Sequence, residues 1–292
     1  MASDEDQSWR RARIQARGSL AFLLRHRGTR EDGAARELSF RCDQSLGHLA
    51  EGLGIPSLEI GAARADGEAW PLELPPPDRS QVELFPLPEP VSLQEPARFI
   101  LDLHLGRLAR MLRLLGFDAI WWEGGAGPAA GSEAEPAAGP RDDPSADLLR
   151  TALAETRILL SRDRALLFRR ELHEEGARRA MLIRSPAPYA QLLEVVRRFG
   201  LESSFRPFSR CAACGSTLIS ATREEVLARI PSVVAERYDQ FFLCPDCGKA
   251  YWKGDHFRNI RPFLDRLAAD LPQQPSSVSR QAATSAPVIR MA

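Results

Sequence analysis

Four cysteines in two matched pairs constrain the fold of this chain more than any other feature. Each pair has the spacing Cys-x-x-Cys, a glycine follows each pair, and 29 residues separate the pairs, which are Cys211 with Cys214 and Cys244 with Cys247. Two turns that each carry two thiolates supply the four soft ligands that zinc binds tetrahedrally. The glycines permit the backbone angles that such turns need. Because four thiolates leave no open coordination position, we predict a structural zinc ribbon and not a catalytic zinc centre.

The use of cysteine also bears on the compartment. The chain has five cysteines in 292 residues, and only Cys42 falls outside the two pairs. This arrangement favours metal binding over a disulfide framework, so we expect a reducing compartment, the cytoplasm. No apolar run approaches the ~20 residues of a membrane span, and the N-terminus lacks the apolar core of a secretory signal. The formal net charge is zero, so any basic surface that binds nucleic acid must be local.

The first part of the chain has the pattern of a small β-rich module. Residues 1–18 are polar and charged, and we predict that they form a disordered lead. Residues 19–90 favour a β-grasp module that ends before a proline-spaced linker. Its expected elements are a hairpin formed by Ser19–Arg25 and Glu37–Arg41, a helix at Ser45–Leu53 and a strand at Val82–Leu87.

The middle of the chain, residues 97–207, alternates apolar strands with amphipathic helices. This order predicts βαβ crossovers and a mainly parallel sheet with helices on both faces, an α/β fold. Residues 124–140 interrupt it with Gly, Ala, Pro and Glu, and we predict a flexible insertion there. The expected strands are 98–101, 117–122, 157–161 and 180–184.

The zinc ribbon is expected over residues 208–267, followed by a disordered tail at 271–292. Aromatic and basic residues follow the second cysteine pair, and the candidates for RNA binding among them are Trp252, Lys253, His256 and Arg258. Aromatic rings can stack on bases while the cations neutralise phosphates. The alternative is that the aromatic side chains pack the small core of the ribbon.

Acidic residues in the α/β domain suggest a second, different metal site. Asp102 and Asp163 each follow a predicted strand, and Asp147 enters a helix between them. Ligands of open parallel sheets bind outside the carboxyl ends of the strands, so these carboxylates are expected to converge there. Carboxylate oxygens suit Mg²⁺ or Mn²⁺, which activate water for attack on a phosphodiester. The alternative is that each aspartate caps a turn or a helix.

Three arginines lie on the helix expected after Asp102. Arg107, Arg110 and Arg113 could hold phosphates next to the bond that is cleaved. Arginines at such spacing also form a solvated helix face, with their apolar stems on the protein surface.

Five motifs are spaced through the α/β domain and the ribbon: FILD at 99–102, LGRLARMLR at 105–113, LGFD at 115–118, RILLSRDR at 157–164 and CPDCGKAYWKGDH at 244–256. With their spacing, these motifs resemble the Mut-seven C-terminal RNase family. That family joins a PIN-like nuclease domain to a zinc ribbon, and its bacterial members often carry a ubiquitin-like module in front. The resemblance is close over about 97–267 and loose over the front module.

The resemblance implies roles for the acids. Asp102 and Asp163 match the acidic metal ligands of PIN-like sites, and Asp147 is the best match for the acid between them. Asp142 and Asp143 are alternatives for this middle position, because the insertion obscures the register before it.

A hydroxyl or a fourth acid often accompanies the last strand motif of PIN-like sites, and here Ser161 is the candidate. The front module departs from ubiquitin-like sulfur carriers, because it ends in Phe85-Pro86-Leu87-Pro88 and not in Gly-Gly. Conjugation chemistry is therefore not expected, and its partner is unknown.

Together these features predict a metal-dependent ribonuclease with three units, a β-grasp module, a PIN-like α/β domain and a zinc ribbon that helps to bind RNA. A homodimer is compatible with the sequence, although no interface signature is visible. One alternative is a non-catalytic RNA-binding or ribosome-associated adaptor in which the acids act only as caps. Another is a protein–protein scaffold without affinity for nucleic acid.

Overall fold

The structure is a computed structural model that describes residues 9–24, 35–93, 96–123, 144–172 and 179–271, without the side chains of 144 and 255–259. Within these ranges no helix is both long and apolar enough to cross a lipid bilayer. The insertion predicted at 124–140 and nearly all of the tail predicted at 271–292 lie outside the described residues.

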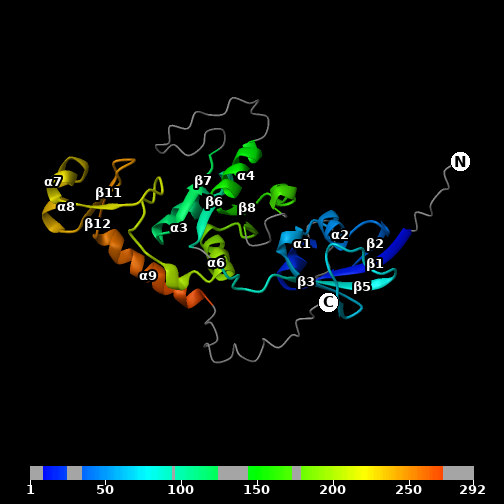
Figure 1. Cartoon of the computed structure of the whole chain (residues 1–292). Helices are drawn as coiled ribbons and strands as arrows, with labels where there is room; N and C mark the ends of the chain where they lie inside the picture. Colours follow the sequence, from blue (N-terminus) through cyan, green and yellow to red (C-terminus); the bar gives the residue numbers. More distant parts are fainter. Residues whose placement is uncertain (1–8, 25–34, 94–95, 124–143, 173–178, 272–292) are drawn as a thin grey trace, which may run out of the picture. The chain divides into compact units, whose positions relative to one another are not determined.

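The N-terminal module is built on a mixed five-stranded sheet (Figure 1). Its order is β2-β1-β5-β3-β4, in which β1 pairs in parallel with β5 and the other neighbours are antiparallel. This is the arrangement of the β-grasp fold class, whereas a specific likeness to ubiquitin stays a prediction. The elements are β1 (Trp9–Ala16), η1 (Gly18–Leu20), α1 (Ala21–Leu24), β2 (Arg36–Arg41), α2 (Leu46–Gly52), η3 (Ser57–Glu59), β3 (Ile60–Ala65), β4 (Glu68–Ala69) and β5 (Ser80–Pro86).

The first strand corrects the predicted start of this module. Residues 9–16, expected to be part of a disordered lead, form β1 at the centre of the sheet. Alternate residues Ala12, Ile14 and Ala16 are buried, with the polar Arg13 and Gln15 between them. The polar residues make the segment look hydrophilic as a whole, so its period-2 pattern is easily missed. The prediction of a strand at Ser19–Arg25 was also wrong. There the chain forms η1 and α1, which place Leu20, Leu23 and Leu24 in the core at helical spacing.

The middle domain has the predicted parallel sheet. Its four strands are ordered β7-β6-β8-β9, all neighbours are parallel, and helical segments lie between strands that are consecutive in the chain. The chain therefore belongs to the α/β class here, as the alternation predicts. The elements are β6 (Arg98–Leu101), η4 (Leu103–Leu105), α3 (Gly106–Leu114), β7 (Asp118–Trp121), α4 (Pro144–Ala154), β8 (Ile158–Ser161), α5 (Arg164–Leu167), η5 (Arg170–Leu172), β9 (Ala180–Leu182), α6 (Pro188–Phe199) and η6 (Glu202–Ser204).

A buried ion pair joins the N-terminal module to the parallel sheet. The Glu59 carboxylate accepts the backbone N–H of Leu182 on edge strand β9 at 2.9 Å and Nη2 of Arg198 on α6 at 3.0 Å. Glu59 is 7% exposed and Arg198 is 2% exposed. The hydrophobic core is continuous across the same region, since residues such as Ile14 and Leu182 belong to one buried cluster. The two parts therefore share one core.

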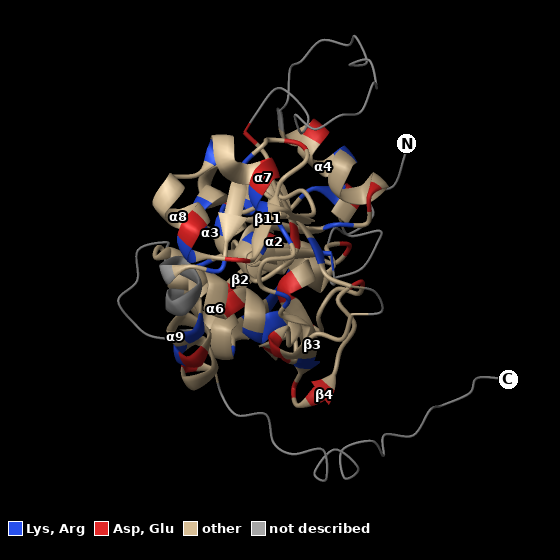
Figure 2. Ribbon diagram, turned by 90° about the vertical axis from the view of Figure 1, so that its left-hand side faces the viewer, with Lys and Arg blue, Asp and Glu red and all other residues tan. Residues whose placement is uncertain are grey.

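The ribbon is a three-stranded antiparallel sheet in the order β10-β11-β12. Its elements are β10 (Ile219–Ala221), α7 (Arg223–Val226), η7 (Leu227–Arg229), α8 (Ser232–Arg237), β11 (Phe241–Leu243) and β12 (Ala250–Trp252). Residues from Lys253 onward form a separate unit that contains α9 (Asp255–Asp270). Basic and acidic residues are interspersed over the elements in Figure 2, in keeping with the net charge of zero.

Candidate metal centre and acidic site

The two cysteine pairs form matching knuckles. In the first, the N–H of Gly215 donates to the carbonyl of Cys211 at 2.8 Å, and in the second the N–H of Gly248 donates to that of Cys244 at 3.0 Å. Both glycines have positive φ, +92° and +70°. Their lack of a Cβ makes this backbone accessible, as the sequence predicts.

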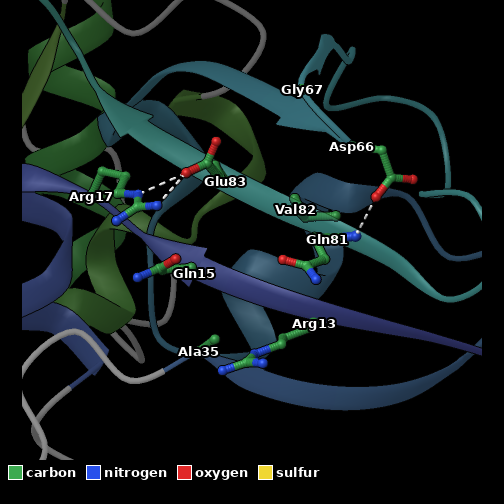
Figure 3. Close-up of a pocket in the computed structure, with 9 residues that line it drawn as sticks. All are labelled: Arg13, Gln15, Arg17, Ala35, Asp66, Gly67, Gln81, Val82 and Glu83. Carbon is green, nitrogen blue, oxygen red and sulfur yellow. Dashed lines mark hydrogen bonds and ion pairs between the residues drawn. The ribbon is translucent and has the colours of Figure 1, made fainter.

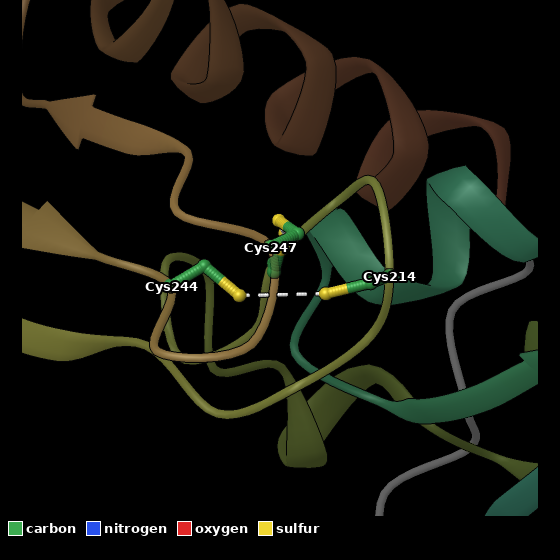
Figure 4. A group of neighbouring side chains, drawn as sticks. Cys214, Cys244 and Cys247 are labelled. Carbon is green, nitrogen blue, oxygen red and sulfur yellow. Dashed lines mark hydrogen bonds between the residues drawn. The ribbon is translucent and has the colours of Figure 1, made fainter. Parts of the chain in front are cut away.

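The knuckles bring four sulfur atoms together. The Sγ atoms of Cys214 and Cys244 are 3.4 Å apart (Figure 4), and those of Cys211 and Cys247 are 3.6 Å apart. All four lie within 4.8 Å of one another. A tetrahedron with metal–sulfur bonds of about 2.3 Å has edges of about 3.8 Å. The quartet therefore fits a tetrahedral ion with small adjustments.

The thiol pKa values show why a cation would complete this centre. Burial raises the pKa of Cys211, but hydrogen bonds from the Tyr251 hydroxyl and from the backbone of the same knuckle outweigh it and lower that pKa to about 6. Burial raises the pKa of Cys244, and it raises that of Cys247 to about 12. Without a cation, some of the four thiols stay protonated at neutral pH, and a bound metal ion would displace those protons.

Two arginines fasten the first knuckle to the α/β domain. Buried Arg113 on α3 donates from Nε to the carbonyl of Ala119 at 2.7 Å and from Nη1 to that of Ala213, inside the knuckle, at 2.5 Å. Arg210 donates to the carbonyl of Gly215 at 3.0 Å and lies 3.4 Å from the Asp118 carboxylate on β7. The ribbon's metal centre is thus held against the edge of the parallel sheet.

The carboxyl ends of β6 and β8 bring two of the predicted acids to one edge of the sheet. Asp102, 7% exposed, accepts the Ser161 hydroxyl at 2.5 Å and the backbone N–H groups of Arg162 and His104 at 2.8 and 2.9 Å. The Ser161 hydroxyl in turn accepts the N–H of Asp163 at 2.9 Å. Asp102 and Asp163 are thus linked through one serine, as neighbouring strands of a parallel sheet predict.

Both acids also cap helices. Asp102 begins η4, and Asp163 begins α5, where its Oδ1 accepts the N–H of Ala165 at 2.8 Å. Asp163 is exposed, and its other oxygen has no partner among the described residues. A carboxylate has about four lone-pair sites, so capping leaves acceptor positions on both side chains.

The third acid stands apart from this pair. Asp147 is half-exposed on α4 and forms an ion pair with Arg150 at 2.6 Å. Among the described residues, the cysteine quartet is the one group of three or more His, Cys, Asp or Glu whose ligand atoms lie within 4.8 Å of one another. Asp102, Asp147 and Asp163 do not form such a group. The alternatives Asp142 and Asp143 lie outside the described residues.

The predicted phosphate- and RNA-binding residues differ in their exposure. Arg107 and Arg110 are exposed on α3, whereas Arg113 is buried in its two carbonyl contacts. Trp252 is half-buried and packs against the ribbon core of Val226, Ile230, Ala235 and Phe241, as the alternative interpretation of the aromatic residues expects. Lys253 is exposed, and the side chains of His256 and Arg258 lie outside what the structure describes.

The comparisons with known proteins bear on the same part of the chain. A model of the Mut7-C RNase domain family matches residues 97–264, more than half of the chain. The chain belongs to the Mut7-C RNase domain family. No curated protein and no solved structure matches it. The match spans the α/β domain, both knuckles and the first part of α9, so the family assignment covers both candidate sites.

In this Mut7-C RNase domain, Trp121 supports the turn that follows Asp102, a role that was not predicted from the sequence. The indole N–H of Trp121 on β7 donates to the carbonyl of Leu103 at 3.1 Å, and a Cβ on Gly106 would lie 2.7 Å from the indole ring. Trp121 therefore covers the turn that follows Asp102. Gly106, the first residue of α3, was the available signal, since an aromatic ring packed this closely on a helix requires a residue without a side chain there.

Proposed function

We propose that this chain is a metal-dependent ribonuclease whose acidic site lies at the carboxyl ends of β6 and β8. Membership of the Mut7-C RNase domain family points to a nuclease. The observation that carries the finer proposal is the linkage of Asp102 to Asp163 through the Ser161 hydroxyl at the edge where parallel sheets bind ligands.

In this proposal Asp102 and Asp163 hold Mg²⁺ or Mn²⁺, and Asp147 is the third acid. When bound, the ion would lower the pKa of a water molecule and stabilise charge on the scissile phosphate. Ser161 acts as a positioning residue, because its hydroxyl fixes the Asp102 carboxylate and accepts the N–H of Asp163. Exposed Arg107 could contact a neighbouring phosphate.

The cysteine quartet is proposed to hold structural Zn²⁺. Four thiolates in a closed tetrahedral arrangement are the chemistry of such sites, although Cys247 is exposed in this structure. The ribbon would then help to bind RNA, with Lys253, His256 and Arg258 as further candidates for contact. Five free cysteines among the described residues favour a reducing compartment, the cytoplasm.

Cleavage of a labelled pool of single- and double-stranded RNA tests this proposal. The zinc-loaded protein is assayed with and without Mg²⁺ or Mn²⁺, and Mn²⁺ binding is measured separately by calorimetry. We expect metal-dependent cleavage, and loss of both cleavage and Mn²⁺ binding in Asp102→Asn and Asp163→Asn. Asp147→Asn tests whether the third acid takes part.

Asp66→Asn is the matched control. The Asp66 carboxylate caps a backbone N–H, that of Gln81 at 2.8 Å, in the N-terminal module, so the substitution removes the same charge from the same kind of contact. Its activity should equal that of the wild type. Full metal-dependent cleavage by both Asp102→Asn and Asp163→Asn would reject the proposed site.

A non-catalytic RNA-binding adaptor is the second candidate. It is favoured by the capping contacts of Asp102 and Asp163 and by the distance of Asp147 from them. The adaptor predicts that the folded, zinc-loaded protein binds RNA without cleaving it. It also predicts that Asp163→Asn leaves the affinity for RNA unchanged.

A further inference from the structure

A basic cavity lies where the α/β domain meets the ribbon. Its volume is about 410 Å³, and residues of both cysteine knuckles line it. Three cations line it, and no acidic residue does. The cations are Arg110, Arg229 and Lys249, and Ala213 and Gly248 line the cavity from the two knuckles.

The three cations are presented from ordered elements. Arg110 projects from α3 next to buried Ala109. Arg229 ends η7, and its Nη1 donates to the carbonyl of Glu225 at 2.9 Å. Lys249 is fixed through its backbone, because its carbonyl accepts the N–H of Cys244 at 2.9 Å. All three are exposed, so a ligand could reach their charged groups.

These charges are not neutralised within the described structure. Arg110, Arg229 and Lys249 form no ion pair with any acid that the structure describes. Three cations around one hollow produce a local positive potential despite the net charge of zero. An anion with several charged oxygens fits this arrangement.

A cavity of the N-terminal module provides a contrast. That cavity, of about 550 Å³, contains basic and acidic residues together (Figure 3). Arg17 is bound by Glu83, and Asp66 accepts the N–H of Gln81. Its cations are therefore offset by acids, whereas the cavity beside the knuckles has a single sign of charge.

We propose that the cavity lined by Arg110, Arg229 and Lys249 binds backbone phosphates of an RNA strand. The inference rests on the proposed ribonuclease function and adds the place at which the ribbon and α3 hold the substrate together. It also explains why the ribbon is fastened to α3 by Arg113, since that contact fixes the walls of the cavity.

The test measures binding of a labelled single-stranded RNA of about 12 nucleotides by fluorescence anisotropy, without Mg²⁺ or Mn²⁺. It uses the full zinc-loaded chain in an Asp102→Asn background to prevent cleavage. Each lost phosphate contact should reduce the slope of log K against log[salt] by about 0.7, which is about 5-fold in affinity at 0.1 M salt. Arg229→Ala and Lys249→Ala should each show this loss, and the triple variant with Arg110→Ala about 100-fold.

Arg223→Ala is the matched control, because Arg223 is exposed on the same ribbon but is paired with Asp239 at 3.0 Å outside the cavity. It should bind RNA within about twofold of the parent protein. Zinc content and circular dichroism are measured for every variant. If the triple variant loses zinc, the Arg110→Lys and Arg229→Lys double variant, which keeps the charges, replaces it and should retain binding.

An unchanged affinity and salt slope in the triple variant would overturn the inference, as would an equal loss in Arg223→Ala. Inorganic phosphate is the second arm: phosphate binding that is lost in the triple variant, measured by calorimetry, together with an unchanged affinity for RNA in that variant would show a site for the free ion instead. If RNA binding is lost in the triple variant but the wild-type protein never cleaves RNA, the ribonuclease proposal is rejected and the proposed phosphate site stands. If the triple variant, with Asp102 restored, still cleaves RNA at the wild-type rate, the ribonuclease proposal stands and the proposed phosphate site is rejected.

Discussion

Replacement of Glu59 by alanine should destabilise the protein strongly, although Glu59 lies outside both candidate sites. The substitution leaves the guanidinium of Arg198, which is 2% exposed, without its main partner. It also leaves the N–H of Leu182 unpaired. Removal of one partner of a buried ion pair costs about 3–5 kcal/mol. The remaining carboxylate near Arg198, that of Glu89 at 3.9 Å, is 39% exposed and would contribute less than ~1 kcal/mol.

Urea unfolding followed by circular dichroism measures this loss in the full chain. Glu83→Ala is the control, because it breaks an ion pair with Arg17 in the same module whose side chains are 30% and 45% exposed, and that change should stay below ~1 kcal/mol. The double variant Glu59→Gln with Arg198→Met should recover most of the stability, since no charge is then left buried.

A loss below ~1 kcal/mol in Glu59→Ala would refute the argument that Glu59 and Arg198 form a desolvated pair. Two separate unfolding transitions in the wild type would contradict it differently, by showing that the module and the α/β domain do not share one cooperative core. A single transition that moves to lower urea concentration as a whole is the expected result.

Three further predictions concern stability and metal content. Cys214→Ser should abolish stoichiometric zinc binding, measured by elemental analysis, and unfold the ribbon, because metal binding energy is folding energy there. Gly116→Ala should lower the free energy of unfolding in urea by at least about 1 kcal/mol, since Gly116 has φ +96° and a Cβ there would clash with the Arg206 carbonyl; equal stability would contradict the geometry. Burial alone would raise the pKa of Asp118, but Arg157 and other arginines lower it below its ordinary value. Its contribution is therefore present above about pH 4 and is lost as the pH falls through the lowered pKa, so the stability difference between wild type and Asp118→Asn should shrink in acid.

The parallel sheet and the knuckles could be predicted because their signals are local. Each sheet strand is a short apolar run, and the acids at Asp102 and Asp163 mark the ends of two of them. The glycines after each cysteine pair carry the positive φ that the knuckles require. Such features depend on neighbours within a few residues, so a single sequence contains them.

The remaining features depend on partners that are distant in sequence. Glu59 and Arg198 are 139 residues apart, and nothing near either residue marks the pair. The cations of the basic cavity come from α3, η7 and the second knuckle, and only the folded chain brings them together. The role of Arg113 was missed for the same reason, since its acceptor Ala213 lies 100 residues away.

The contacts of Glu59 and Arg113 also limit the addition of further strands to the edges of the parallel sheet. Edge strands expose backbone groups that pair readily with strands from other chains. Here the Leu182 N–H on edge strand β9 is taken by Glu59, and the Ala119 carbonyl on the opposite edge strand β7 is taken by Arg113. A strand added at either edge would have to displace a charged side chain. The sheet is thereby protected against aggregation by strand addition, and a second copy of the chain would have to pair through another surface.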